Sequence, residues 1–174
     1  MSHFRAKFLP EILGASKRGW TTWTIAAVDK RVKAITPMVL DCLNMKKNFA
    51  DWWQNMGGWS FALFPYFNEG LTAYFDAPEF EKMAAIIDPL SYKDRLTMPK
   101  LVISATGDEF FNPDDSYNWF DQMIGKTYLR LLPNAEHGMV PPQALSSPSI
   151  IHSISQVFKL MLHRWRSQPI KSKL

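Results

Sequence analysis

The sequence has a single cysteine, Cys42, among its 174 residues. An intrachain disulfide is therefore excluded, and because Cys42 follows the apolar residues 38–40, we expect it to be a small packed side chain. No apolar run reaches the roughly 20 residues that a membrane-spanning helix needs. The apolar part of residues 1–10 is too short, and too broken by charge, to predict a secretory signal.

A broad excess of charge of one sign is also absent. The formal net charge of +4 is accounted for by Arg164, Arg166, Lys171 and Lys173, which lie in the acid-free segment 164–174. The remaining chain is formally neutral, and it has no basic stripe interleaved with aromatic residues. We therefore expect a basic tail on a balanced domain and no nucleic-acid partner.

The basic tail ends in Ser172, Lys173 and Leu174. This tripeptide is the address that the peroxisomal import receptor reads. We expect a peroxisomal location if the source is eukaryotic and a cytoplasmic location otherwise. A solvated basic tail without an address is the alternative.

What the chain does have is abundant aromatic residues and a regular alternation of elements. Its length suits one domain with a sizeable core, spanning residues 1–174. Hydrophobic periodicity predicts strands and helices in alternation, which indicates an α/β fold with a parallel sheet covered on both faces. The predicted strands are 8–13, 32–40, 100–105 and 127–132, and the predicted helices are 17–28, 43–56, 78–87, 114–124 and 149–165. Residues 41–99 are too long for a simple connection and predict a helical, aromatic-rich cap.

The segment 14–19, Gly-Ala-Ser-Lys-Arg-Gly, stands between a predicted strand and a predicted helix. Small residues on both sides of Ser16 allow the sharp turn that exposes a nucleophilic hydroxyl at the end of a strand. A helix-capping role for Ser16 is the alternative.

An acid and an imidazole follow in an order that fits this serine. Asp108 lies just after the predicted strand 100–105, and His137 lies just after the strand 127–132. The order Ser, Asp, His with each residue in a loop after a strand is that of α/β-hydrolases. Asp41 is the alternative acid, and His152 and His163 on the last predicted helix are the alternative bases.

Short motifs spread between residues 14 and 137 carry a family resemblance. They are 14–23 (GASKRGWTTW), 26–29 (AAVD), 31–35 (RVKAI), 44–48 (NMKKN), 57–62 (GGWSFA), 88–89 (DP), 91–92 (SY), 95–100 (RLTMPK), 106–111 (TGDEFF), 113–116 (PDDS) and 133–137 (PNAEH). In these motifs the chain resembles the PhoPQ-activated pathogenicity-related protein family of α/β-hydrolases. The resemblance implies a triad of Ser16, Asp108 and His137, and leaves the substrate open. Bacterial members usually look exported, and some eukaryotic relatives act as secreted growth regulators.

Members of that family are much longer than this chain, which resembles only their C-terminal half. The resemblance implies that four strands preceding the serine-bearing strand are missing. That strand would then be a sheet edge, which invites self-association. The loop that supplies one oxyanion donor would be missing too, and the backbone N–H of Lys17 would be the remaining donor.

The aromatic residues of the predicted cap are candidates for a substrate pocket. Trp52, Trp53, Trp59 and Phe61 are the first choices, with plain core packing as the alternative. Asp108, Glu109, Asp114 and Asp115 lack the spacing of a calcium-binding loop. Nothing in the sequence indicates a metal, nucleotide or flavin, so we expect no cofactor.

These observations predict a serine hydrolase acting on an ester or amide bond of a small molecule or peptide. In this hypothesis Ser16 is acylated, His137 carries the proton and Asp108 orients the imidazole. The alternatives are a non-catalytic binding or signalling protein on the same fold, and an inactive partial product.

Overall fold

The computed structural model describes residues 11–139. The chain divides into two compact units, Met1–Pro141 and Pro142–Leu174, and the described residues belong to the first of them. Residues 11–139 contain one four-stranded sheet in which each strand is parallel to its neighbour and the spatial order follows the chain order. The strands are β1 (Glu11–Ala15), β2 (Ala34–Met38), β3 (Lys100–Ala105) and β4 (Thr127–Leu132).

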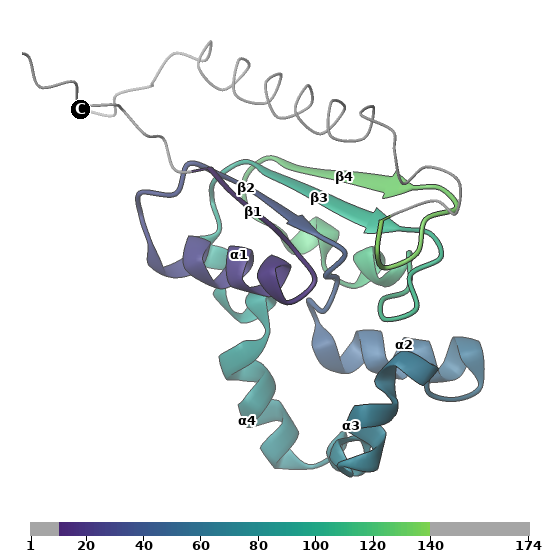
Figure 1. Ribbon diagram of the computed structural model, residues 1–174. Coiled ribbons are helices and arrows are strands. Elements are labelled where there is room, and N and C mark those ends of the chain that lie inside the picture. Colours follow the sequence, from purple (N-terminus) through teal and green to yellow (C-terminus); the bar gives the residue numbers. More distant parts are fainter. Residues whose placement is uncertain (1–10, 140–174) are drawn as a thin grey trace, which may run out of the picture. The chain divides into compact units, whose positions relative to one another are not determined.

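Parallel neighbours need crossover connections, and the described helices supply them. The α-helices are α1 (Lys17–Val28), α2 (Met45–Met56), α3 (Phe64–Asn68) and α4 (Pro78–Ile87). Short 3₁₀ turns add η1 (Phe61–Leu63), η2 (Leu71–Tyr74), η3 (Pro89–Arg95), η4 (Asp115–Asn118) and η5 (Phe120–Gln122). Figure 1 shows α1 against one face of the sheet, and α2, α3 and α4 further out on that same side. The long connection from β2 to β3 carries α2 to α4 with η1 to η3, where the sequence predicts a cap.

Most of the predicted elements are confirmed. The bounds of α1, α4, β3 and β4 are those expected from the sequence, and α2 begins two residues later than expected. β2 is shorter than its apolar run because Val39 takes a positive φ of 43° directly after the strand. The predicted helix 149–165, and with it His152, His163, the basic tail and the terminal tripeptide, lies outside the described residues.

The prediction of one helix over 114–124 is wrong. The chain instead forms η4 and η5, separated at Trp119, whose φ of −144° is not helical. Burial of the Trp119 side chain, which is 0% exposed, explains the break, because its indole N–H donates to the Asp41 carboxylate. Tyr117, just before the break, is 89% exposed.

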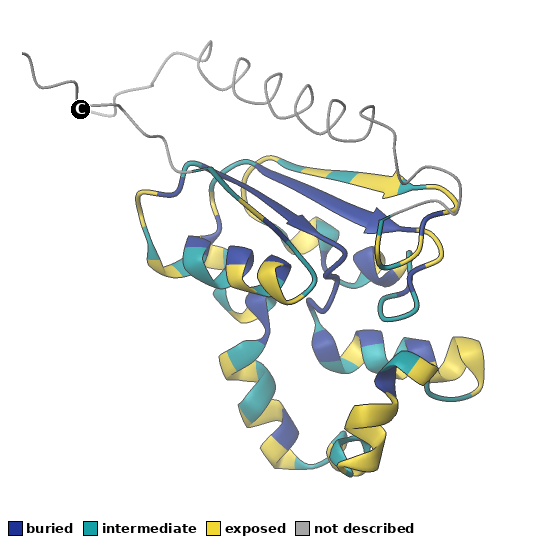
Figure 2. Cartoon of the chain, in the orientation of Figure 1, coloured by how far each residue is buried: buried dark blue, intermediate teal, exposed yellow. Residues whose placement is uncertain are grey.

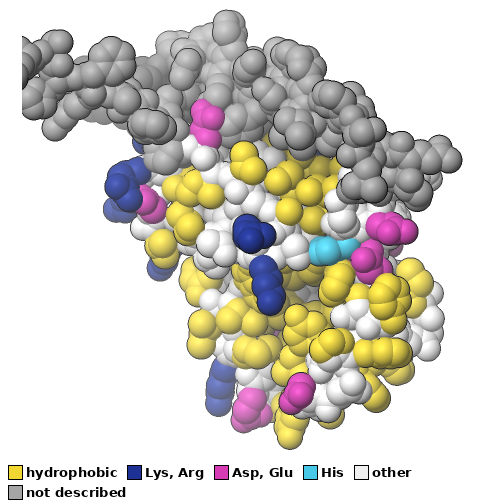
Figure 3. Space-filling view, in the orientation of Figure 1, with side chains coloured by type: hydrophobic (Ala, Val, Ile, Leu, Met, Phe, Trp, Pro, Cys, Tyr) yellow, Lys and Arg dark blue, Asp and Glu magenta, His cyan; other side chains and the backbone are white. Residues whose placement is uncertain are grey.

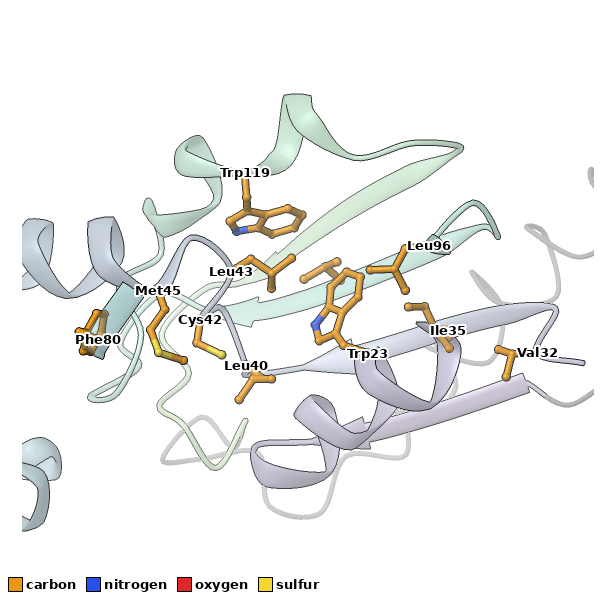
Figure 4. Packing of buried hydrophobic residues seen from close by; sticks show 12 residues of the cluster. Trp23, Val32, Ile35, Leu40, Cys42, Leu43, Met45, Phe80, Leu96 and Trp119 are labelled. Atoms are coloured by element: carbon orange, nitrogen blue, oxygen red, sulfur yellow. The ribbon is translucent and has the colours of Figure 1, made fainter. Parts of the chain in front are cut away.

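The core lies between α1 and the two central strands. β2 and β3 are buried along their whole length, as Figure 2 shows. Trp23 of α1 packs edge-to-face on Trp119, with ring centroids 6.2 Å apart, and both belong with Ile35 and Leu96 to the cluster of Figure 4. Cys42 is part of the same cluster, and its burial confirms the expected packing role and raises the pKa of its thiol.

None of the helices within residues 11–139 is long and apolar enough to cross a membrane.

Candidate active site

Ser16 occupies the turn between β1 and α1. Its backbone has φ 55° and ψ −126°, a conformation that is rare for a residue with a side chain and is found at functional turns. The Ser16 N–H donates to the Met38 carbonyl at 2.9 Å, and the Ser16 carbonyl accepts from the N–H of Trp20 at 3.1 Å. The turn is therefore held by β2 on one side and by the first turn of α1 on the other.

The two glycines of the motif allow this turn because backbone approaches them closely. A Cβ on Gly14 would lie 2.4 Å from the Arg18 carbonyl oxygen, well inside contact distance. A Cβ on Gly19 would lie 3.0 Å from the Leu40 side chain and 3.1 Å from the Met38 carbonyl oxygen. The spacing Gly-x-Ser-x-x-Gly is thus required by packing of α1 against β1 and the end of β2.

Asp108 lies in the loop after β3, with its side chain buried. Its Oδ1 accepts hydrogen bonds from the backbone N–H groups of Phe110 at 2.8 Å and Phe111 at 3.1 Å. These two backbone donors hold the carboxylate in one orientation.

His137 lies in the loop after β4, and several hydrogen bonds join this loop to the Asp108 loop. The N–H of Gly107 donates to the Ala135 carbonyl at 2.9 Å, and the N–H of Asn134 donates to the Thr106 hydroxyl at 3.0 Å. The N–H of His137 itself donates to Glu109 Oε2 at 3.0 Å. These contacts hold the acid and the imidazole in a fixed relation to each other.

The three side chains meet at the carboxyl ends of β1, β3 and β4. His137 Nε2 lies 2.8 Å from Ser16 Oγ, and His137 Nδ1 lies 3.0 Å from both Asp108 carboxylate oxygens. The Asp108 side chain is 1% exposed and that of His137 is 15% exposed. In Figure 3 the histidine, the only one among residues 11–139, reaches the surface among hydrophobic and acidic side chains.

This arrangement can move a proton from a hydroxyl to an imidazole. With Asp108 accepting from Nδ1–H, the Nε2 lone pair faces the serine hydroxyl, which is the tautomer a general base needs. Ser16 makes no side-chain hydrogen bond that caps α1, so the alternative capping role finds no support in its contacts.

Asp41, the alternative acid, is engaged elsewhere. It is 0% exposed and accepts a hydrogen bond from the indole of Trp119. Burial raises the pKa of its carboxyl to about 8, with smaller contributions from the negative charges of Asp108 and Asp114. The histidine ring bonds to Asp108 instead.

Glu109 and the following phenylalanines are neighbours of the site that sequence reasoning missed. The Glu109 carboxylate accepts a hydrogen bond from the His137 backbone N–H. The Glu109 backbone carbonyl accepts a second one from the Ser60 hydroxyl at 2.6 Å. The ring centroids of Phe110 and Phe111 lie 4.4 Å and 5.9 Å from the centroid of the His137 ring. Their position directly after Asp108 in the sequence could have indicated that they lie near the site. Their contact with the imidazole depends on how the two loops fold.

The four aromatic candidates for a pocket are placed differently from one another. Trp59 lines an apolar cavity of about 140 Å³, and Trp52 is buried at 5% exposure beside a smaller one. Trp53 is 47% exposed and lines, with Trp59, a separate pocket of about 350 Å³. Phe61 is 71% exposed and lines neither this pocket nor the 140 Å³ cavity. Lys17 is the first residue of α1, so its N–H is among the helix donors that lack an intrahelical partner.

Within residues 11–139, no group of three or more His, Cys, Asp or Glu side chains could hold a metal ion.

Solved structures with a similar fold include hydrolases. An acetyl xylan esterase from Paenibacillus sp. R4 matches with a TM-score of 0.62 and 13% identity, over 86% of this chain and 44% of the esterase. An acylaminoacyl peptidase from Pyrococcus horikoshii matches with a TM-score of 0.54 and 18% identity, over 88% of this chain and 23% of the peptidase. At these identities the likeness establishes the α/β-hydrolase fold expected from the sequence.

The sequence comparisons identify the family. Autocrine proliferation repressor protein A of Dictyostelium discoideum is 42% identical over 153 residues, which cover 87% of this chain and 30% of that protein. The chain therefore spans less than a third of this curated relative. The family model for PhoPQ-activated pathogenicity-related protein matches residues 7–171. The chain belongs to the PhoPQ-activated pathogenicity-related protein family.

Proposed function

We propose that this protein is a serine hydrolase that cleaves an ester or amide bond through an acyl-serine intermediate. The observation that carries the proposal is the continuous hydrogen-bond chain from Ser16 Oγ through the His137 ring to the Asp108 carboxylate. Its members lie at the ends of three strands on one rim of an α/β-hydrolase sheet, where that fold has its active site.

In the first half-reaction Ser16 Oγ attacks the substrate carbonyl carbon while its proton passes to His137 Nε2. The imidazolium then gives this proton to the departing alcohol or amine, and the acyl group remains on Ser16. Water attacks the acyl-serine with His137 again as the base, which releases the acid and restores the serine hydroxyl. Asp108 stabilises the imidazolium in both halves and fixes the ring orientation.

The backbone N–H of Lys17 is the proposed donor to the developing oxyanion. It opens α1, so the positive end of the helix dipole adds to its effect. In the α/β-hydrolase fold a second donor comes from a loop after an earlier strand. Where one donor is lost, turnover falls by about 10²–10³. Within residues 11–139, the Lys17 N–H is the donor that we assign.

A fluorophosphonate probe tests the proposal, because it forms a covalent adduct with an activated serine. We expect the folded protein to be labelled and Ser16→Ala to lose the label. Ser91→Ala is the matched control. Ser91 lies on η3, and among the described residues its hydroxyl makes only a long 3.5 Å contact to the Ala84 carbonyl, so the substitution should leave labelling unchanged. Labelling that survives Ser16→Ala would contradict the proposal.

The second candidate is a non-catalytic regulator or an inactive partial product on the same fold. It is favoured by the name of the Dictyostelium relative, a proliferation repressor, and by the small part of that relative that this chain covers. β1 stands at the edge of the described sheet, and a sheet edge is a place where a second polypeptide or a second copy can pair. A protein with native circular dichroism that takes up no probe would favour this candidate.

A further inference from the structure

An apolar cavity of about 140 Å³ lies beneath the long β2–β3 connection. Trp20 contributes from α1, Phe49 from α2, Phe80 and Met83 from α4, and Trp59 from the segment between them. Figure 4 shows Cys42, Met45 and Phe80, all lining residues, together at one end of the hydrophobic cluster. The cavity is therefore built jointly from the helix that follows Ser16 and the cap-like connection.

Its lining is suited to an uncharged group. None of the described residues that line it carries a charge. The Trp20 indole N–H is already occupied, since it donates to the Ile87 carbonyl at 2.7 Å. The lining hydroxyl groups belong to Tyr66 and Thr72, which are neutral. An ion placed there would therefore lose hydration without meeting an opposite charge, which is unfavourable.

The cavity borders the proposed catalytic residues. Phe110 and Phe111 line it and also lie 4.4 Å and 5.9 Å from the His137 ring. On the other side Trp20 lies one helical turn after Ser16 and donates its backbone N–H to the Ser16 carbonyl. A substrate whose carbonyl carbon lies at Ser16 can thus extend an apolar group past the phenylalanines.

We propose that this cavity binds the acyl group of the substrate, and that the group is an uncharged aliphatic chain or ring of about six carbons. This inference rests on the proposed hydrolase function. A dry apolar cavity of about 150 Å³ in another protein accommodates benzene, which sets the size of the occupant. An acetyl group would leave most of the space empty, and a dodecanoyl chain would exceed it.

The chain-length dependence of hydrolysis tests the inference. With the full chain and p-nitrophenyl acetate, butyrate, hexanoate and dodecanoate, kcat/KM should rise about fourfold for each added methylene up to hexanoate. It should then fall for dodecanoate. Equal rates for acetate and hexanoate would overturn the inference while leaving the hydrolase proposal intact.

A pair of variants on α4 localises the effect. Met83→Trp places a larger side chain in the cavity and should remove the preference for hexanoate over acetate while acetate hydrolysis persists. Ile86→Trp is the matched control, since Ile86 is 68% exposed on the same helix and does not line the cavity. Retention of the preference in correctly folded Met83→Trp would contradict the assigned site.

Binding without turnover separates the two proposals. Ser16→Ala should bind the neutral probe hexanamide saturably, with a change in tryptophan fluorescence because Trp20 and Trp59 line the cavity. Addition of Met83→Trp should abolish this binding. Binding by Ser16→Ala with no hydrolysis by the unmodified chain supports the cavity and overturns the hydrolase. No saturable binding by Ser16→Ala overturns the cavity.

Discussion

Two buried carboxyl groups, Asp41 and Asp108, follow neighbouring strands of this sheet. Asp108 has two backbone N–H donors and the His137 ring as partners. Asp41 has the Trp119 indole, and its second oxygen, Oδ2, has no hydrogen-bond partner among the described residues. Because of these different partners, Asp108 is placed to orient the imidazole, whereas Asp41 is placed to hold the Trp119 side chain.

Asparagine substitutions at these two positions should therefore differ sharply. Asp108→Asn cannot hold the required tautomer of His137, and we expect ester hydrolysis to fall by about 10⁴. Asp41→Asn keeps an oxygen for the Trp119 indole and should change kcat/KM only slightly. Steady-state hydrolysis of p-nitrophenyl hexanoate by both variants, with circular dichroism as the folding control, measures this. Loss of activity in Asp41→Asn with Asp108→Asn unaffected would assign the acid to Asp41.

Much of the candidate site could be predicted residue by residue. The order of Ser16, Asp108 and His137, each in a loop after a strand, is visible in the sequence because parallel strands bring their carboxyl ends to one rim. Glu109 could not be assigned, since its contact with the His137 backbone depends on how two loops pack together.

At the scale of elements, the β1–α1 unit depends on the absence of a side chain at Gly14. Gly14→Ala would place a methyl group 2.4 Å from a main-chain oxygen of α1, so the helix must move away from the strand. We expect a loss of roughly 1–3 kcal/mol in the free energy of unfolding, the range for overpacking, together with loss of probe labelling at Ser16.

Gly58→Ala is the control for this substitution. A Cβ at Gly58 would meet no atom within 4 Å, so its effect on the free energy of unfolding should be small. Urea unfolding of both variants measures the difference, and equal stability would contradict the packing account.

The elements also show where periodicity misleads. Helices α1 and α4 and strands β3 and β4 have strong local patterns, and their bounds could be predicted. The segment 114–124 has helical spacing as well, yet burial of Trp119 against Asp41 breaks it into η4 and η5. A tertiary hydrogen bond outweighed the local preference there.

For the molecule as a whole, buried acids make stability dependent on pH. Burial raises the pKa of Asp41 to about 8 and that of Asp115 to about 9. The folded state thus keeps protons that the unfolded chain releases near the ordinary aspartate pKa of 3.8. Because the folded state binds more protons in this window, the free energy of unfolding should fall as pH rises from about 4 to 8.

Each such group contributes at most about 1.4 kcal/mol per pH unit. In Asp41→Asn, the free energy of unfolding should fall less steeply with rising pH. Urea unfolding at pH 5, 6, 7 and 8 measures this dependence. Lys100 acts with the opposite sign and at higher pH, since burial lowers its pKa to about 8 from 10.5. If the free energy of unfolding falls with pH equally steeply in Asp41→Asn and in the unmodified protein, groups other than Asp41 cause the pH dependence.

The cavity beside His137 is a property of the whole fold, and its lining could be predicted only in part. Its walls come from α1, α2, α4 and the Asp108 loop, which are far apart in the sequence. Aromatic residues in the cap suggested a pocket, but nothing local distinguished Trp59, which lines the cavity, from Phe61, which is exposed.

The proposed chemistry requires that the hydroxyl at the end of β1 be activated by the imidazole at the end of β4. Peptide mass spectrometry of the folded chain after reaction with a fluorophosphonate tests this most directly. We expect a single covalent adduct on Ser16 that does not form in His137→Ala. An adduct on another serine, or none on natively folded protein, would contradict the proposed activation.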